Sequence, residues 1–135
     1  MWGDRANDTM MSLQILQNRA AKEILDLLFL SSASDALDRL GWKRLCHRRK
    51  EHRCSFIYKS INNLIDSDFN IVFNKDVHNY NTRNRDNIRI PRSKRRWGQW
   101  SVASRAAVDW NSLDKSIRSI DNLNLFKKSV HNLNF

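Results

Sequence analysis

The sequence predicts a mainly α-helical fold: a small irregular helical bundle with a loop-rich basic insertion and room for one short β segment. Three observations support this. The 135 residues are 41% hydrophobic and 28% charged, with one Pro and three Gly, a composition that suits a helical globular piece better than a disordered tail or a β-sandwich. Apolar residues recur at helical spacing in several segments. Residues 74–96 are rich in Asn, Asp and Arg, and Pro91 forbids a continuous helix there.

Residues 10–30 are predicted to form the first long helix. One apolar stripe at helical spacing consists of Leu13, Leu16, Ala20, Ile24 and Leu27. The opposite side carries Ile15, Leu25 and Phe29. A helix that is apolar on two sides is usually sandwiched between neighbours, or it has lost one of them.

A short helix is predicted over 35–40, with Ser34 as its N-cap and Gly41 as the residue that ends it. We expect Trp42 to pack on the core. Residues 43–65 are predicted to form the second long helix, and its buried face is expected to consist of Cys46, Cys54, Ile57, Tyr58, Ile61, Leu64 and Ile65. A short helix or turn over 66–73 should bury Phe69, Ile71, Val72 and Phe73.

Two further helices are predicted after the basic insertion. In 97–113, the apolar stripe consists of Ala103, Ala106, Ala107, Trp110 and Leu113. A last helix, capped by Asp121 or Ser119, should direct Leu123, Phe126 and Val130 inward. Within the insertion, the alternation over 87–91 weakly supports the short strand. These segments divide the chain into 1–73, 74–96 and 97–135, as one domain or as a fragment of a larger one.

The net charge of +10 is concentrated in two blocks. Residues 43–59 hold seven basic and one acidic residue, and residues 83–96 hold the same numbers. A polyanion would meet these blocks first, because phosphate binding is mainly charge neutralisation with counterion release. A solvated surface that keeps the protein soluble is the alternative interpretation. The residues predicted to contact nucleic-acid phosphates are Arg48, Arg49, Lys50, Arg53, Arg83, Arg85, Arg89, Arg92, Lys94, Arg95 and Arg96.

Aromatic residues near the second block could stack on bases. Trp97 and Trp100 flank it and Tyr80 precedes it, so for these three a nucleic-acid role and a packing role are about equally supported. Trp42 and Trp110 lie on apolar stripes, where core packing is the better interpretation.

Catalytic and metal chemistry is not predicted. Two Cys and two His lie within residues 46–54, but in a continuous helix Cys46 and Cys54 would be ~12 Å apart along the axis, too far for one zinc. There is no Gly-rich phosphate loop, HExxH or paired-carboxylate motif. We therefore expect no catalytic residues, no metal and no cofactor. No apolar run is long enough for a membrane span and no secretory pattern is present, which predicts an intracellular protein, nuclear or cytoplasmic.

Several segments together resemble a known family. Trp2-Gly3 and the run LQILQNRAA at 13–21 are similar to the W-G … L-Q-x-x-Q-N-R-A-A pattern near the end of reverse transcriptases of jockey-like non-LTR retrotransposons. LGW at 40–42 with RR at 48–49, YK at 58–59 with NNL at 62–64, and HNYNTR at 78–83 match further motifs of that family in order. WNSL at 110–113 and FK at 126–127 resemble its ending, and together these matches cover nearly the whole chain.

The resemblance implies the region downstream of the polymerase palm, around and beyond the thumb. The family's catalytic aromatic-x-Asp-Asp motif does not occur here, so the chain would be a non-catalytic C-terminal fragment. In the intact protein this region would help to hold the RNA and the primer-template duplex. Two departures, Asp114 where the family usually has Pro and the lack of a Pro near Asp66, would loosen the expected turns.

Three functions follow as hypotheses. The first is a fragment that binds RNA or an RNA–DNA hybrid through backbone phosphates, with affinity but little sequence preference. The second is a protein-interaction fragment that packs on the missing polymerase through its exposed apolar faces. The third is a stand-alone DNA-binding helical module, although no turn and recognition-helix pair is evident.

Overall fold

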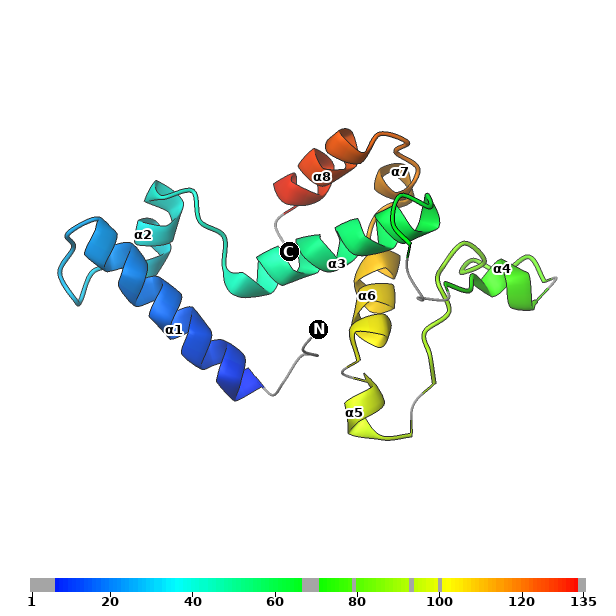
Figure 1. Cartoon of the computed structure of the whole chain (residues 1–135), viewed down its shortest axis with the longest axis horizontal. Helices are drawn as coiled ribbons and strands as arrows, with labels where there is room; N and C mark the ends of the chain where they lie inside the picture. Colours follow the sequence, from blue (N-terminus) through cyan, green and yellow to red (C-terminus); the bar gives the residue numbers. More distant parts are fainter. Residues whose placement is uncertain (1–6, 67–70, 79, 93, 100, 134–135) are drawn as a thin grey trace. The chain divides into compact units, whose positions relative to one another are not determined.

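The chain is mainly helical in a computed structural model, which describes residues 7–66, 71–78, 80–92, 94–99 and 101–133 (Figure 1). Its helices are α1 (Asn7–Ile24), α2 (Ala33–Arg39), α3 (Leu45–Ile61), α4 (Asn74–Val77), α5 (Arg96–Gln99), α6 (Val102–Asn111), α7 (Lys115–Arg118) and α8 (Leu123–Asn132). The predicted fold class is therefore confirmed.

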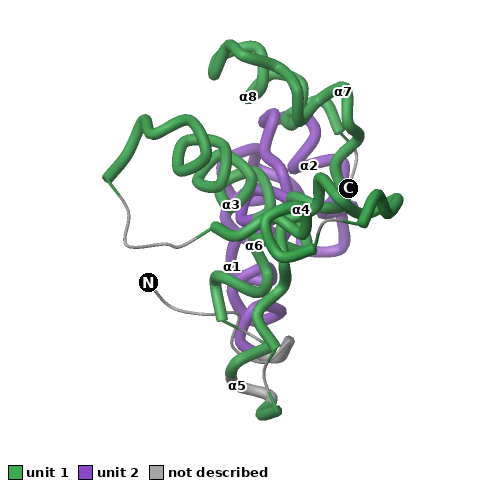
Figure 2. The backbone as a smooth tube through the Cα atoms, turned by 90° about the vertical axis from the view of Figure 1, so that its right-hand side faces the viewer, with its two compact units in different colours: residues 1–3, 50–135 green, residues 4–49 purple. Residues whose placement is uncertain are grey.

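Two compact units make up the chain (Figure 2). Unit 1 comprises Lys50–Phe135 with Met1–Gly3, and unit 2 comprises Asp4–Arg49. The boundary between the units lies inside α3, between Arg49 and Lys50. The segments predicted from the sequence ended at residues 73 and 96. Residues 74–96 belong to the same unit as the C-terminal helices. Within the described residues, no helix combines the length and apolar character needed to cross a bilayer.

Unit 2 is built on the packing of α1 against α2 at Ala21, Ala36 and Leu37, which are buried. The N-cap of α2 is Ser32, whose hydroxyl accepts the Asp35 N–H (3.3 Å); the prediction of Ser34 was wrong by two residues. Gly41 ends the helix as predicted, at φ +64°. The Trp42 N–H bonds the Leu37 carbonyl (2.8 Å) and the Gly41 N–H bonds that of Asp38 (3.0 Å), which is a Schellman closure.

Most of the apolar stripe noted on the first helix is exposed on α1, and only Leu27 of it packs on the small core of unit 2. Leu13, Leu16 and Ile24 expose 47–59% of their surface, and α1 ends at Ile24 because Asp26 takes a positive φ of 51°. Polar side chains of α1 instead hold the start of α3 within unit 2. The Gln14 side-chain oxygen accepts the Leu45 N–H (2.9 Å), one of the four N–H groups that a helix start leaves without a partner.

Trp42, expected in the core, is 38% exposed, because the Schellman closure leaves its indole at the surface of unit 2. The Gln17 side-chain amide donates to the Lys43 carbonyl nearby (3.0 Å). Together with Gln14, it fixes the turn between α2 and α3 through hydrogen bonds rather than through the predicted apolar contact.

Unit 1 has one hydrophobic core, where α3, α6 and α8 meet. The buried residues of this core are Cys54, Ile57, Tyr58, Ile88, Ala106, Ala107, Trp110, Leu113, Phe126 and Val130. Phe126 is central to it: its ring stacks on Tyr58 with centroids 4.4 Å apart and lies 5.8 Å from that of Trp110. The Tyr58 hydroxyl donates to the Asp121 carbonyl, so the polar tip of this buried ring is satisfied.

Most of the predicted core positions of unit 1 are confirmed, but the ends of the predicted helices differ. Leu64 is exposed because the chain turns at Asn63 (φ 52°), just after the end of α3. Cys46, near the start of α3, is exposed as well. The helix expected over 97–113 is divided into α5 and α6, since the Ser101 hydroxyl accepts the Ser104 N–H (3.2 Å) and starts a new helix. Asn122 caps α8, in place of Asp121 or Ser119.

In the segment predicted as a short helix or turn over 66–73, the described residues 71–73 lie outside any helix. Ile71, Val72 and Phe73 are half-buried, and Phe69 lies outside the described residues. Phe73 forms an antiparallel bridge with Ile88. The predicted short strand over 87–91 is thus reduced to a single bridge.

Replacing Phe126 with Ala should lower the free energy of unfolding by about 3–5 kcal/mol, the usual cost of truncating a buried Phe. The residue is fully buried and contacts both Tyr58 and Trp110. Urea denaturation followed by circular dichroism measures the change. The matched control is Leu125→Ala on the exposed side of the same helix, which should change stability by only about 0.5 kcal/mol or less. Equal effects of the two substitutions would contradict this core.

Candidate nucleic-acid interface

The second basic block lies on a loop that the structure pins at its base. The Phe73–Ile88 bridge closes it, with the Arg89 N–H donating to the Val72 carbonyl (2.8 Å) and the Asn74 N–H donating to the Asn87 carbonyl (3.0 Å). Further out, the Lys75 N–H donates to the Arg85 carbonyl (3.0 Å). We call residues 71–95 the basic loop. Backbone hydrogen bonds join the two sides of this loop, so it is not an extended linker.

Asn111, at the end of α6, holds the basic loop to the helical core. Its side-chain oxygen accepts the Ile88 N–H and its side-chain NH₂ donates to the Ile88 carbonyl, both at 2.8 Å. This amide therefore satisfies both backbone groups of a buried residue, as a neighbouring strand would. Arg118 of α7 adds a second tie, since its guanidinium donates to the Asn87 side-chain oxygen (2.9 Å).

The charge of the basic loop is strongly positive and faces solvent. Residues 71–95 contain seven basic and two acidic residues. The side chains of Arg83, Arg85, Arg89, Arg92, Lys94 and Arg95 are all exposed. Among the residues that the structure describes, the first four form no ion pair with an acid, and Asp76 is occupied in accepting the Phe73 N–H (3.1 Å). The charges of these four arginines are therefore not paired with an acid within the described part of the loop.

A polar hollow of about 340 Å³ lies at the root of the basic loop. It is lined by Asn74, His78, Asn84, Asn87, Ile88, Arg89, Ile90, Arg92 and Asn111. Two arginines and several amide groups thus surround one concave surface. Guanidinium and amide N–H groups are the donors that bind phosphate oxygens, so the hollow is chemically suited to a phosphate of a nucleic-acid backbone.

The predicted contact residues on α3 are not equivalent to those of the loop. Arg53 forms a largely buried ion pair, with its Nε 2.6 Å from a carboxylate oxygen of Asp109 on α6. It joins two core helices of unit 1, and its role as a phosphate ligand is corrected to a structural one. Lys50 belongs to unit 1 as well and is half-buried.

Arg48 and Arg49 belong to unit 2, so the helical block does not form one surface within a single unit. Arg48 is exposed. The guanidinium of Arg49 is half-buried and directed at the sulfur of Met10 on α1 (2.6 Å). Arg49 therefore helps to pack α1, whereas Arg48 remains a candidate for phosphate contact.

The aromatic candidates are placed only in part. Tyr80 is 77% exposed on the basic loop, which leaves its ring accessible for stacking. Trp100 and the side chains of Arg96 and Trp97 lie outside the described residues. Sequence reasoning missed Asn111 and His78 as parts of this site. Both lie inside the quoted motifs WNSL and HNYNTR, which was the available signal.

The cysteines do not form a metal site with the histidines around them. α3 runs unbroken through Cys46 and Cys54, and Cys46 is exposed whereas Cys54 is buried. Within the described part of the chain, no three His, Cys, Asp or Glu side chains are close enough to hold a metal ion. Burial, reinforced by the negative charge of Asp109, raises the pKa of the Cys54 thiol to about 12. Cys54 is therefore a core residue with an unreactive thiol.

Thiol labelling should separate the two cysteines. At pH 8, the native protein should react with iodoacetamide at Cys46 only, because the thiolate is the reactive form and a thiol with a pKa of about 12 is protonated at that pH. Intact mass and peptide mapping measure the labelled site, and both cysteines should react in denaturant. Rapid native labelling of Cys54 would contradict its burial.

Replacing Asn111 with Ala should detach the basic loop from α6. The Ile88 N–H and carbonyl would lose their partner, at a cost of about 1–3 kcal/mol for a buried group left without a hydrogen bond. Hydrogen exchange of the Ile88 amide should accelerate, while the amides of Ile57 and Phe126 in the core keep their protection. Asn124→Ala, on the exposed side of α8, is the matched control. An unchanged exchange rate of the Ile88 amide in N111A would show that the Asn111 hydrogen bonds do not hold the loop.

Comparison of the chain with protein-family models, with curated proteins and with solved structures gives no match.

Proposed function

We propose that this protein is a non-catalytic nucleic-acid-binding module that holds RNA or an RNA–DNA hybrid by its backbone phosphates through the basic loop. The observation that carries the proposal is the set of four exposed arginines at 83, 85, 89 and 92, which pair with no described acid, on a backbone fixed by Asn111. A fixed backbone matters because a flexible basic segment loses conformational entropy when it becomes ordered on binding, and this loss would offset part of the free energy gained from phosphate contacts.

Phosphate contact fits this surface better than base reading. Arginine side chains on an irregular loop can follow a phosphate backbone, whereas reading bases in a DNA major groove commonly uses a helix or a β-ribbon. α4, the helix inside the loop, has only four residues and is not a recognition helix. The proposed binding therefore carries affinity with little sequence preference.

The family resemblance of the sequence gives this activity a context. A C-terminal fragment of a retroelement reverse transcriptase would lie beside the RNA and the primer-template duplex, and it would need positive charge without catalytic carboxylates. The basic loop and the HNYNTR motif lie in the same stretch of chain. On this proposal the catalytic residues belong to a part of the polymerase that this sequence does not contain.

Binding of a 20-base-pair RNA–DNA hybrid, measured by fluorescence anisotropy, should weaken steeply with salt. The triple variant R83Q/R85Q/R89Q should flatten the plot of log affinity against log salt concentration by up to about three units, roughly one for each lost phosphate contact. The measurement is repeated on hybrids of unrelated sequence, which should bind within about threefold of one another if backbone phosphates dominate.

The matched control is R19Q/R39Q/R44Q, which removes the same charge from exposed positions of unit 2. It should lower affinity much less, because only the loop arginines are proposed to touch phosphates. Equal losses from both triple variants would show a diffuse charge effect and refute the site. Strong discrimination among duplex sequences would favour a specific DNA-binding module instead.

A second function, docking on a polymerase domain, is favoured by the surface of unit 2. Leu28, Phe29 and Leu30 expose 78–93% of their surface, and the exposed α1 stripe adds Leu13 and Leu16. Exposed apolar residues of this kind mark protein contacts when they form a contiguous patch. On this proposal the partner is the palm and thumb of the reverse transcriptase that the sequence resembles.

Co-expression with such a palm and thumb should raise the yield of soluble protein and its melting temperature. The change should be lost in L13S/L16S, which makes the α1 stripe polar, and kept in S12A/R19A as an exposed control on the same helix. No gain from co-expression, or an equal gain for the wild type and L13S/L16S, would exclude docking through this face.

A further inference from the structure

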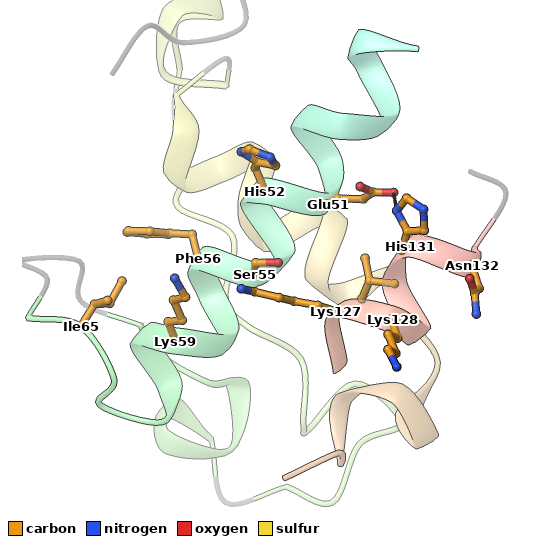
Figure 3. Close-up of a pocket in the computed structure, with 11 residues that line it drawn as sticks. Glu51, His52, Ser55, Phe56, Lys59, Ile65, Lys127, Lys128, His131 and Asn132 are labelled. Atoms are coloured by element: carbon orange, nitrogen blue, oxygen red, sulfur yellow. Dashed lines mark ion pairs between the residues drawn. The ribbon is translucent and has the colours of Figure 1, made fainter. Parts of the chain in front are cut away.

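A second basic site lies in unit 1, in a pocket of about 820 Å³ between α3 and α8 (Figure 3). It is lined by Glu51, His52, Ser55, Phe56, Lys59, Ile65, Lys127, Lys128, Val130, His131 and Asn132. None of these residues was predicted as a contact residue from the sequence. The volume is within the range of small-ligand pockets, roughly 300–1,000 Å³.

The pocket has a positive part and an apolar part. In Figure 3 the Lys127 side chain reaches from α8 toward Ser55 of α3, and the ammonium end of Lys59 lies beside Phe56. Glu51 is the acid among the described lining residues, and its carboxylate lies 3.4 Å from His131 Nδ1. Glu51 therefore has a partner at the pocket rim, and Lys59 and Lys127 line the same pocket from α3 and α8.

Apolar surface borders this positive part. The Phe56 ring and Ile65 line the pocket next to Lys59, and the buried Val130 closes it from α8. Phe56 also packs against the core of unit 1, which fixes its position. Cations that line one pocket with a fixed aromatic ring are the features that bind a phosphate and an attached base.

We propose that the α3–α8 pocket binds one nucleotide unit of a single strand, with its phosphate between Lys59 and Lys127 and its base against Phe56 and Ile65. This proposal rests on the proposed function in taking nucleic acid as the ligand. The pocket would be a subsite for a single strand, and it shares no residue with the basic loop, which is proposed to contact the duplex.

An acidic peptide is a less suitable occupant. Its carboxylates would be attracted by the lysines, but a peptide would gain nothing particular from the aromatic and aliphatic wall beside them. A nucleotide uses both parts of the pocket through its phosphate and the flat face of its base.

The test titrates the full chain with adenosine monophosphate, inorganic phosphate, adenosine and a hexaglutamate peptide at constant ionic strength. The readout is the shift of the Ile65 and Val130 methyl signals in nuclear magnetic resonance spectra. The nucleotide should bind at least about tenfold more tightly than phosphate or adenosine alone, the gain expected from one stacked base. Equal affinities, no methyl shifts, or tighter binding of the peptide would overturn the proposal.

The double variant K59Q/K127Q should lose about tenfold or more in nucleotide affinity, since two phosphate contacts are removed. The control R19Q/R39Q removes the same charge from exposed positions of unit 2 and should bind the nucleotide as the wild type does. Phe56→Leu keeps an apolar side chain and should reduce the nucleotide to the affinity of phosphate. Wild-type affinity in K59Q/K127Q, or in Phe56→Leu, would overturn the assignment.

The two proposals fail in different ways. If the hybrid binds through the basic loop but the nucleotide does not shift the pocket signals, the subsite is wrong and the proposed function stands. If the nucleotide binds in the pocket but the hybrid shows no salt-dependent binding, the pocket stands as a nucleotide site and the proposed function is wrong.

Discussion

The basic loop depends on one side-chain amide. Asn111 bonds both backbone groups of Ile88 at 2.8 Å, and Ile88 is the buried loop residue in the core of α3, α6 and α8, with Ile71 and Phe73 packed against that core. Without that amide, the buried N–H and carbonyl of Ile88 would be left without a hydrogen-bond partner unless water entered the core. A well-packed core disfavours both outcomes. The position of every arginine beyond Ile88, and of the polar hollow beside it, follows from this attachment.

The positive residues of the chain divide into structural and available ones by their partners. Arg53 is held by Asp109 and Arg118 by Asn87, so each joins two elements of unit 1. The arginines at 83, 85, 89 and 92 project from a closed backbone into solvent. Net charge alone does not distinguish the structural cations from the available ones, because both a buried ion pair and a phosphate-binding surface require positive side chains. The proposed function therefore depends on the second group only.

The helical class and most of the unit 1 core could be predicted from apolar spacing, because Ile57, Tyr58, Trp110 and Phe126 lie on faces that pack. The α1 stripe shows the limit of the same reasoning: periodicity marks a face as apolar but does not say whether a partner is present, so the sequence leaves both outcomes open. The observed helix starts differ from the predicted ones by a few residues, because the N-caps are Ser32, Ser101 and Asn122 and not the neighbouring residues that could also cap a helix. The pairing of Arg53 with Asp109, the clasp of Asn111 and the α3–α8 pocket join residues far apart in sequence, which no local pattern encodes.

The most direct test of the central claim is hydrogen exchange of the whole chain with and without a saturating RNA–DNA hybrid, read residue by residue. Binding through the basic loop should give new protection over residues 83–92, Ile88 included, with no change in α1 and α2. Protection confined to α1 and α2, or unchanged exchange throughout the basic loop at full saturation, would contradict it.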